Sequence, residues 1–341
     1  MSRSEPGARA QHRAPESRSS GVGGVVTSIR DWADRVQQRQ VVFAFPYAVI
    51  KKFGDDGGGR HAALLTYYGF LSVFPLLLLV VATVSTVLQA NTALRAQLID
   101  AIVPVQFRST VNSALLALPS GGVPLIIGVA GLLFGGLGIV FSAYDTLNHI
   151  AAVPHRRRLP ILHRYLRIMA TLVVMIIGVA SVGAIAVAVG ALTDLPGISR
   201  LAAFIATTAL TFLVLWTATA LLLPHRARLA IIWPAALLGS LAITVVVTFG
   251  AVVLPRFVAR SGPVYGSFAT IVGLFALLFL VSQVLVIAGE VAIVRRRRLW
   301  PRALDSNAPT DADRRALLGL AREQERIAGE RVEVTFDVDS G

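Results

Sequence analysis

The chain has 341 residues, of which 55% are hydrophobic and only 15% are charged, and its mean hydropathy is +0.69. Soluble domains contain about 25% charged residues, so a soluble globular fold is excluded. A transmembrane β-barrel is excluded as well, because barrel strands alternate apolar and polar residues and the apolar runs here are continuous. The composition therefore predicts an all-α fold, a polytopic membrane helical bundle. Residues 61–300 contain four acidic side chains: Asp100, Asp145, Asp194 and Glu290.

The net charge of +13 suggests an anionic partner. Because the basic residues lie mostly beside the apolar runs, where they set orientation and contact anionic headgroups, we expect membrane lipids as partners and no nucleic acid. The absence of cysteine excludes disulfides and thiolate metal sites. The six histidines show no metal-ligand spacing, and no nucleotide-binding or hydrolase motif is present. We therefore expect no enzymatic activity, no metal and no cofactor.

The N-terminal part divides into two segments. Residues 1–24 are rich in Ser, Arg, Gly and Pro, a composition that predicts a disordered cytoplasmic tail. Residues 25–53 intersperse charged residues among apolar ones, which predicts an amphipathic helix along the membrane surface. We expect Pro46 to break or bend this helix, Lys51 and Lys52 to close it, and residues 55–59 to form a flexible turn.

Six apolar runs are long enough to cross a bilayer, which needs about 20 residues of helix. Pro75 lies inside the first run and should kink it, and Gly131 and Gly135 in the second form a small-xxx-small face for close packing within or between molecules. Residues 89–121 predict one or two short helices outside the membrane. The predicted spans are residues 62–88, 123–148, 168–192, 201–223, 230–254 and 264–293.

These elements define three parts of the chain. After the tail of residues 1–24, the membrane domain is predicted to occupy residues 25–300. Residues 301–341 are predicted to form a cytoplasmic tail that contains one short amphipathic helix and an acidic, disordered end.

Basic residues near the span ends are unevenly divided between the two sides of the membrane. Six spans place both termini on one side, which carries fourteen basic residues against five. The positive-inside rule therefore predicts that both termini are cytoplasmic. The fourteen are Lys51, Lys52, Arg60, Arg156, Arg157, Arg158, Arg164, Arg167, Arg226, Arg228, Arg295, Arg296, Arg297 and Arg298. The five are Arg95, Arg108, Arg200, Arg256 and Arg260.

Three stretches resemble one family. The first span has the sequence AALLTYYGFLSVFP from Ala62 to Pro75, a small-residue run followed by Tyr-Tyr and Leu-Ser-x-Phe-Pro. The second span has a glycine-rich face and ends at Asn148. The sixth opens with Tyr-Gly-Ser at residues 265–267 and ends with Gly-Glu at 289–290 before four arginines. Together they resemble the YihY/BrkB family over roughly residues 40–300.

The resemblance implies a six-helix bacterial protein of the cytoplasmic membrane that is linked to envelope integrity, with lipid or amphiphile transport proposed for some members. The family was once labelled ribonuclease BN, a name generally regarded as misassigned. The signature residues are interpreted as packing residues. They are Tyr67, Tyr68, Ser72, Pro75 and Gly289.

Glu290 is the sharpest candidate for a functional residue, because a carboxylate inside an apolar span is costly unless it is paired or hydrated. The alternative is a local ion pair with Arg295 near the membrane boundary. Asp145, Asn148 and His149 end the second span at the same predicted depth. With Glu290 they form a candidate polar gate or headgroup site, and the alternative is a structural network that joins the second and sixth spans.

The arginine clusters are candidate contacts for anionic lipids, and they are equally well explained as topology determinants. These candidates are Arg156, Arg157, Arg158, Arg295 and Arg296. A further set of polar residues within the spans could line a cavity or form hydrogen bonds between helices. We favour the hydrogen bonds between helices. That set is Tyr67, Tyr68, Ser72 and Gln283.

Three hypotheses for the function follow. The first is transport or flipping of an anionic lipid or amphiphile, and the second is a non-transporting scaffold for envelope integrity. The third, a membrane-bound ribonuclease, depends only on the old family label. Four scattered acids within residues 61–300 are too few for the metal-binding carboxylates of a nuclease.

Overall fold

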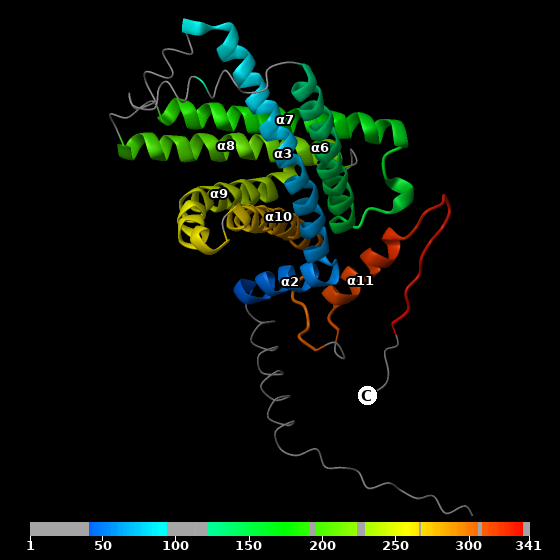
Figure 1. Cartoon of the computed structure of the whole chain (residues 1–341). Coiled ribbons are helices and arrows are strands. Elements are labelled where there is room, and N and C mark those ends of the chain that lie inside the picture. Colours follow the sequence, from blue (N-terminus) through cyan, green and yellow to red (C-terminus); the bar gives the residue numbers. More distant parts are fainter. Residues whose placement is uncertain are drawn as a thin grey trace, which may run out of the picture.

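The computed structural model describes residues 41–93, 113, 122–190, 196–223, 229–265, 267–305 and 309–336. Within these residues the regular structure is helical, and six helices are long and apolar enough to cross a membrane (Figure 1). The predicted all-helical six-span fold is thus confirmed. The helices are α2 (Val41–Asp55), α3 (Gly58–Ala90), α6 (Gly122–Ile150), α7 (Ile161–Gly190), α8 (Pro196–Leu222), α9 (Leu229–Tyr265), α10 (Ser267–Arg297) and α11 (Asp311–Glu323).

The structure refines two of the predicted elements. Pro46 does not break α2, because a proline removes only one backbone hydrogen bond and buried Ala48 and Val49 hold the helix against α10. The apolar part of α9, Ile232–Gly250, lies within the predicted fifth span of residues 230–254, and the helix continues beyond it to Tyr265. The predictions for residues 1–40, and for nearly all of residues 94–121, lie outside the described residues.

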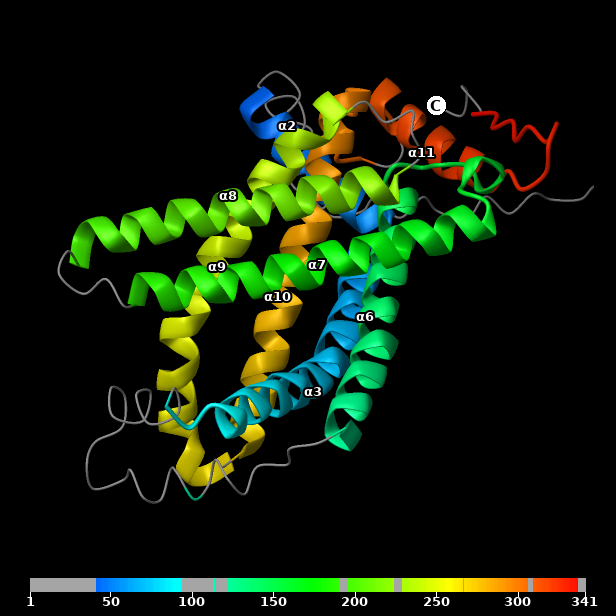
Figure 2. The same cartoon turned by 90° about the horizontal axis from the view of Figure 1, so that it is seen from above.

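Four of the spanning helices form the main body of the molecule. The helices α3 and α6 pack along each other, as do α9 and α10, and α10 also packs against α3. The helices α7 and α8 form an antiparallel pair that runs across the other four helices rather than along them (Figures 1 and 2). This pair contacts the main body through α8 against α9 and α7 against α6.

The contact between α3 and α6 is close because glycines of α6 face the signature residues of α3. A Cβ added to Gly131 would lie 2.7 Å from Cγ of Pro75, and one added to Gly135 would lie 3.0 Å from Cα of Ser72. The Ser72 hydroxyl donates to the Gly69 carbonyl of its own helix at 2.7 Å. Ser72 and Pro75 therefore serve a helix contact that only glycine on the partner helix permits.

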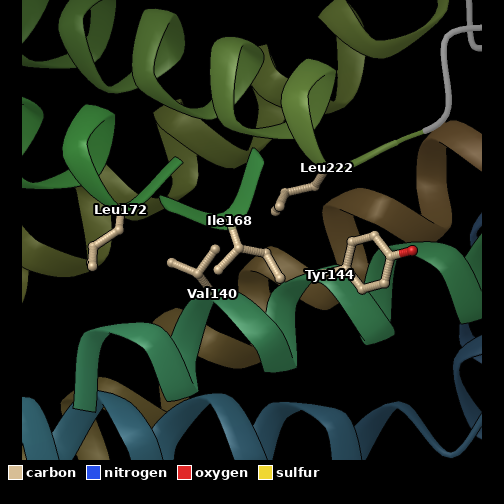
Figure 3. Packing of buried hydrophobic residues seen from close by; sticks show 5 residues of the cluster. All are labelled: Val140, Tyr144, Ile168, Leu172 and Leu222. Carbon is tan, nitrogen blue, oxygen red and sulfur yellow. The ribbon is translucent and has the colours of Figure 1, made fainter. Parts of the chain in front are cut away.

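A buried apolar cluster joins α6 to the α7–α8 pair. Figure 3 shows its side chains between the three helices, with the Tyr144 hydroxyl at one edge. That hydroxyl accepts a hydrogen bond from the Leu159 N–H at 3.3 Å. The cluster consists of Val140, Tyr144, Ile168, Leu172 and Leu222.

One end of the bundle gathers most of the described charged side chains. We call it the charged end and define it as residues 41–60, 145–160 and 290–325. The helices α2 and α11 both lie there (Figure 1), so the two ends of the described chain are on the same side. The predicted short C-terminal helix is present as α11, which Thr310 and Asp313 cap reciprocally.

Candidate functional site

A cavity of about 1200 Å³ opens between α3, α6, α7, α8, α9 and α10. Most of its walls are apolar, with small residues of α9 such as Ala236 and Gly239 on one side and Val140 and Met175 on another. It exceeds the roughly 300–1,000 Å³ of pockets for drug-sized ligands. Its size and apolar walls suit a large apolar ligand such as an acyl chain.

Three arginines extend this lining at the charged end. They are Arg157, Arg296 and Arg297. Arg297 donates to the Ala151 carbonyl at 2.5 Å, which places its guanidinium at the end of α6. The cavity therefore has apolar walls and a cationic end, the distribution that an anionic amphiphile requires.

A second hollow of about 600 Å³ lies between α2, α9 and α10. Its lining includes Arg295 and Arg296 beside Trp233 and Trp300. Tryptophan and arginine together are typical of the boundary between hydrocarbon and headgroups. Arg296 lines both this hollow and the large cavity.

Behind the cavity wall, a buried cluster of charges joins α2 to α10. Glu290 is 0% exposed, and its Oε2 lies 3.0 Å from Nζ of Lys52. Lys52 also contacts the Asp56 carboxylate and donates to the Ile150 carbonyl at 3.2 Å. The cluster therefore ties α2 to the ends of α6 and α10.

A histidine pair lies next to this cluster. The rings of His61 and His149 are 4.9 Å apart between centroids. Nε2 of His149 lies 3.1 Å from the Asp56 carbonyl, and its Nδ1 lies 2.8 Å from Oε2 of Glu323 at the end of α11. His149 therefore bridges the buried cluster and the C-terminal helix.

Acidic residues at the end of α11 neutralise two of the candidate lipid-binding arginines. Arg158 donates to Oε1 of Glu323 at 2.7 Å, and Arg156 donates through Nε to Oε2 of Glu325 at 2.8 Å. The Arg156 guanidinium holds the pKa of Glu325 below its ordinary value. These two arginines therefore hold α11 against the loop after α6.

Asp313 holds the start of α11 in place. Its carboxylate lies 2.9 Å from Nζ of Lys51 and 2.8 Å from Nε of Arg302, and it accepts the Ala303 N–H at 2.9 Å. Arg302 also pairs with Asp55 at 2.8 Å. Burial opposes ionisation of Asp313, but the hydrogen bonds outweigh it and hold the pKa of this carboxyl well below its usual range.

The predicted gate residues are only partly brought together. Glu290 and His149 both approach Asp56, but Glu290 pairs with Lys52 rather than with Arg295. Asn148 is 0% exposed and donates to the Tyr144 carbonyl of its own helix at 2.8 Å. Asp145 lies apart from the buried cluster, because its side chain is 63% exposed and faces Arg158 at 3.6 Å.

The signature tyrosines take different positions. Tyr68 lies against Gly138 of α6, whereas Tyr67 is 56% exposed, and their rings meet edge to face at 5.2 Å. Gly289 lines the large cavity beside Ile150. In the described part of the chain, the cavity lining includes none of Tyr67, Tyr68, Ser72 and Gln283.

Sequence reasoning missed the principal partners at this site. The sequence places Lys52 at a helix end and Asp56 in a flexible turn, and it indicates no role for the C-terminal acids Asp313, Glu323 and Glu325. One local signal was available, since Lys52 and Asp56 have the i, i+4 spacing of a helical ion pair. Arg302 and Asp313 are 11 positions apart, but the pairs of His149 with Glu323, Arg156 with Glu325 and Arg302 with Asp55 join residues more than 150 positions apart. Among the residues that the structure describes, no group of histidine and acidic side chains could hold a metal ion.

Six apolar helices around a cavity define a multi-pass α-helical membrane protein. The profile of the family described as Virulence factor BrkB matches residues 49–313, and the chain belongs to this family. The matched region extends past residue 300 and includes Arg302 and Asp313.

One curated relative is the Inner membrane protein YhjD of Escherichia coli (strain K12), which is 27% identical over 128 residues. The match covers 35% of this chain and 37% of the relative, so it spans little more than a third of either protein. No solved structure matches.

Proposed function

We propose that this protein binds an anionic lipid or similar amphiphile in the large cavity and moves it within or across the membrane. The observation that carries this proposal is the cavity of about 1200 Å³, with apolar walls and three arginines at one end. The apolar walls resemble the hydrocarbon that the acyl chains of a membrane lipid leave, so these chains can enter the cavity without a large penalty. The arginines supply the charge that an anionic headgroup requires.

We infer further that the membrane is the cytoplasmic one and that the charged end faces the cytoplasm. The name of the YhjD relative places that protein in the inner membrane. The excess of basic residues at the charged end supports the cytoplasmic orientation through the positive-inside rule. In this orientation Arg157, Arg296 and Arg297 would face the cytoplasmic headgroup layer.

The test is reconstitution of the full chain into liposomes that contain a fluorescent anionic phospholipid. Protein-dependent movement between leaflets, detected by a membrane-impermeant quencher, is the expected result. Ala236→Phe should strongly reduce it by filling the cavity, whereas Leu237→Phe should not, because Leu237 is 45% exposed on the outer face of the same helix. No movement with any of several lipid classes would overturn the transport proposal.

The arginines provide a second comparison. Arg157→Ala and Arg296→Ala should weaken binding of an anionic lipid while leaving a zwitterionic one unaffected. Arg298→Ala is the matched control, since this adjacent exposed residue lines neither hollow. Equal effects of all three substitutions would show that general surface charge, rather than the cavity, attracts the lipid.

A second candidate function is a non-transporting scaffold that supports envelope integrity. The observation in its favour is the ion-pair network that holds α11 rigidly to α2 and to the loop after α6. In that case, breaking the network would abolish envelope integrity in cells, while filling the cavity with Ala236→Phe would not.

A further inference from the structure

The buried cluster of Lys52, Asp56 and Glu290 has an excess of negative groups. All three are almost fully buried, with exposures of 5%, 2% and 0%. Among the residues that the structure describes, Lys52 is the one cation within ion-pair distance of the two carboxylates. If both carboxylates were ionised, these three buried side chains would carry a net negative charge, and a net charge that is almost fully buried is strongly unfavourable.

The hydrogen bonds of the cluster point to the same imbalance. Glu290 Oε2 lies within ion-pair distance of Lys52, yet neither Glu290 oxygen has a hydrogen bond of good geometry among the described residues. Lys52 directs its donors instead to Asp56 and to the Ile150 carbonyl. A buried carboxylate oxygen without a donor is rare in folded proteins, whereas a protonated carboxyl group supplies its own donor.

Other titratable groups surround the cluster. His61 and Arg60 at the start of α3 and Arg297 at the end of α10 lie close to Asp56 or its neighbours, and His149 of α6 contacts the Asp56 carbonyl. From α11, Glu323 approaches only through His149 and Arg158. The neighbouring α9 has one charged residue among its described side chains, Arg256, which lies toward the opposite end of that helix.

We propose that the Lys52–Asp56–Glu290 cluster is a proton-binding site, in which Glu290 holds one exchangeable proton at neutral pH. The proton neutralises the excess charge and supplies the donor that the Glu290 oxygens lack among the described residues. A proton fits better than a metal cation, because Nζ of Lys52 already occupies the space between the carboxylates and repels a second cation there.

The proton-binding site lies next to the cavity wall, so its protonation state affects the charge beside the cavity. Gly289, next to Glu290, and Ile150, whose carbonyl binds Lys52, both line the cavity wall. Loss of the proton would therefore place a negative charge directly behind the wall near Arg296 and Arg297. The proton-binding inference goes beyond the proposed transport function and does not depend on it.

Infrared spectroscopy of the purified full chain in nanodiscs tests the proposal. Most carboxyl groups are ionised at pH 7, because their pKa values are near 4. We expect a band of protonated carboxyl groups that persists at pH 7, corresponds to one group per chain and disappears in alkaline solution. The band should be lost in Glu290→Gln or in Asp56→Asn.

Glu323→Gln is the matched control, since Glu323 is also buried but both of its oxygens are paired, with His149 and Arg158. This variant should retain the band. If the wild-type chain shows no such band at pH 7, or if the band survives both Glu290→Gln and Asp56→Asn, the proposal is overturned. The wild-type titration decides the question even where a variant does not fold, and it requires no lipid substrate, so the outcome of the transport assay does not affect it.

Discussion

The charged end and the membrane-spanning half of this protein are held together by different interactions. At the charged end, ion pairs join residues far apart in the sequence, such as Arg302 with Asp55 and Lys51 with Asp313. In the spanning half, α3 and α6 approach closely through glycines, as at Gly135 against Ser72. The difference reflects the two solvents, since lipid tails offer no hydrophobic driving force between helices and close packing must supply it.

The two regions should therefore tolerate different kinds of substitution. A buried charge network depends on every partner, because removal of one leaves another charge uncompensated. A close helix contact tolerates loss of polarity but not added volume. The cavity lies between the two regions, with its apolar walls among the spanning helices and its arginines at the charged end.

The largest effect is expected from Asp313→Asn. This change removes the carboxylate that pairs with Lys51 and Arg302, and loss of a buried ion-pair partner costs roughly 3–5 kcal/mol. Hydrogen–deuterium exchange should show faster exchange of residues 309–325. Asp311→Asn is the control, since Asp311 lies exposed in the same first turn, and equal effects of both variants would contradict a specific role for Asp313.

Acid should release α11 from its contacts only at low pH. Because the hydrogen bonds hold the pKa of Asp313 below its ordinary value of 3.8, its stabilising contribution is present above pH 3.8 and is lost as the pH falls further. Exchange protection of α11, corrected for the intrinsic rate, should therefore decline only below pH 3.8. A decline that begins well above this value would show that other groups control the docking.

A smaller effect is expected from Gly135→Ala in the spanning half. The added Cβ would lie 3.0 Å from Cα of Ser72, so α3 must shift, and overpacking of this kind costs about 1–3 kcal/mol. Thermal unfolding in detergent measures the loss. Gly183→Ala in α7 is the control, because nothing lies within 4 Å of its added Cβ, and it should be neutral or stabilising.

The smallest effect is expected at the end of α6. Ala152 has a φ of 44°, a left-handed conformation that costs a residue with a Cβ about 1 kcal/mol. Ala152→Gly should therefore raise the stability slightly in the same unfolding assay. Ala151→Gly should not, because Ala151 has no such conformation. A loss of stability in Ala152→Gly would mean that chain flexibility outweighs the relief of strain.

Much of the fold follows from the local sequence. Continuous apolar runs predicted all six spanning helices, because a helix in lipid must satisfy its own backbone hydrogen bonds. The same reasoning does not show that α2 continues through Pro46 or that α9 continues past its apolar part to Tyr265. Asp145 shows the limit for the site. The sequence predicts that it lies at the same depth as Glu290, but depth does not determine which way a side chain faces, and Asp145 is exposed and faces Arg158.

The sequence by itself determined that this is a six-span helical membrane protein, and it marked Glu290 as an unusual charge in an apolar run. It could not determine that Lys52 and Asp56 surround that charge or that α11 pairs with Arg156 and Arg158. Hydropathy is a property of each segment alone, whereas these pairs depend on how the segments pack together. Only the tertiary structure decided which charges are buried together and which arginines remain at the end of the cavity.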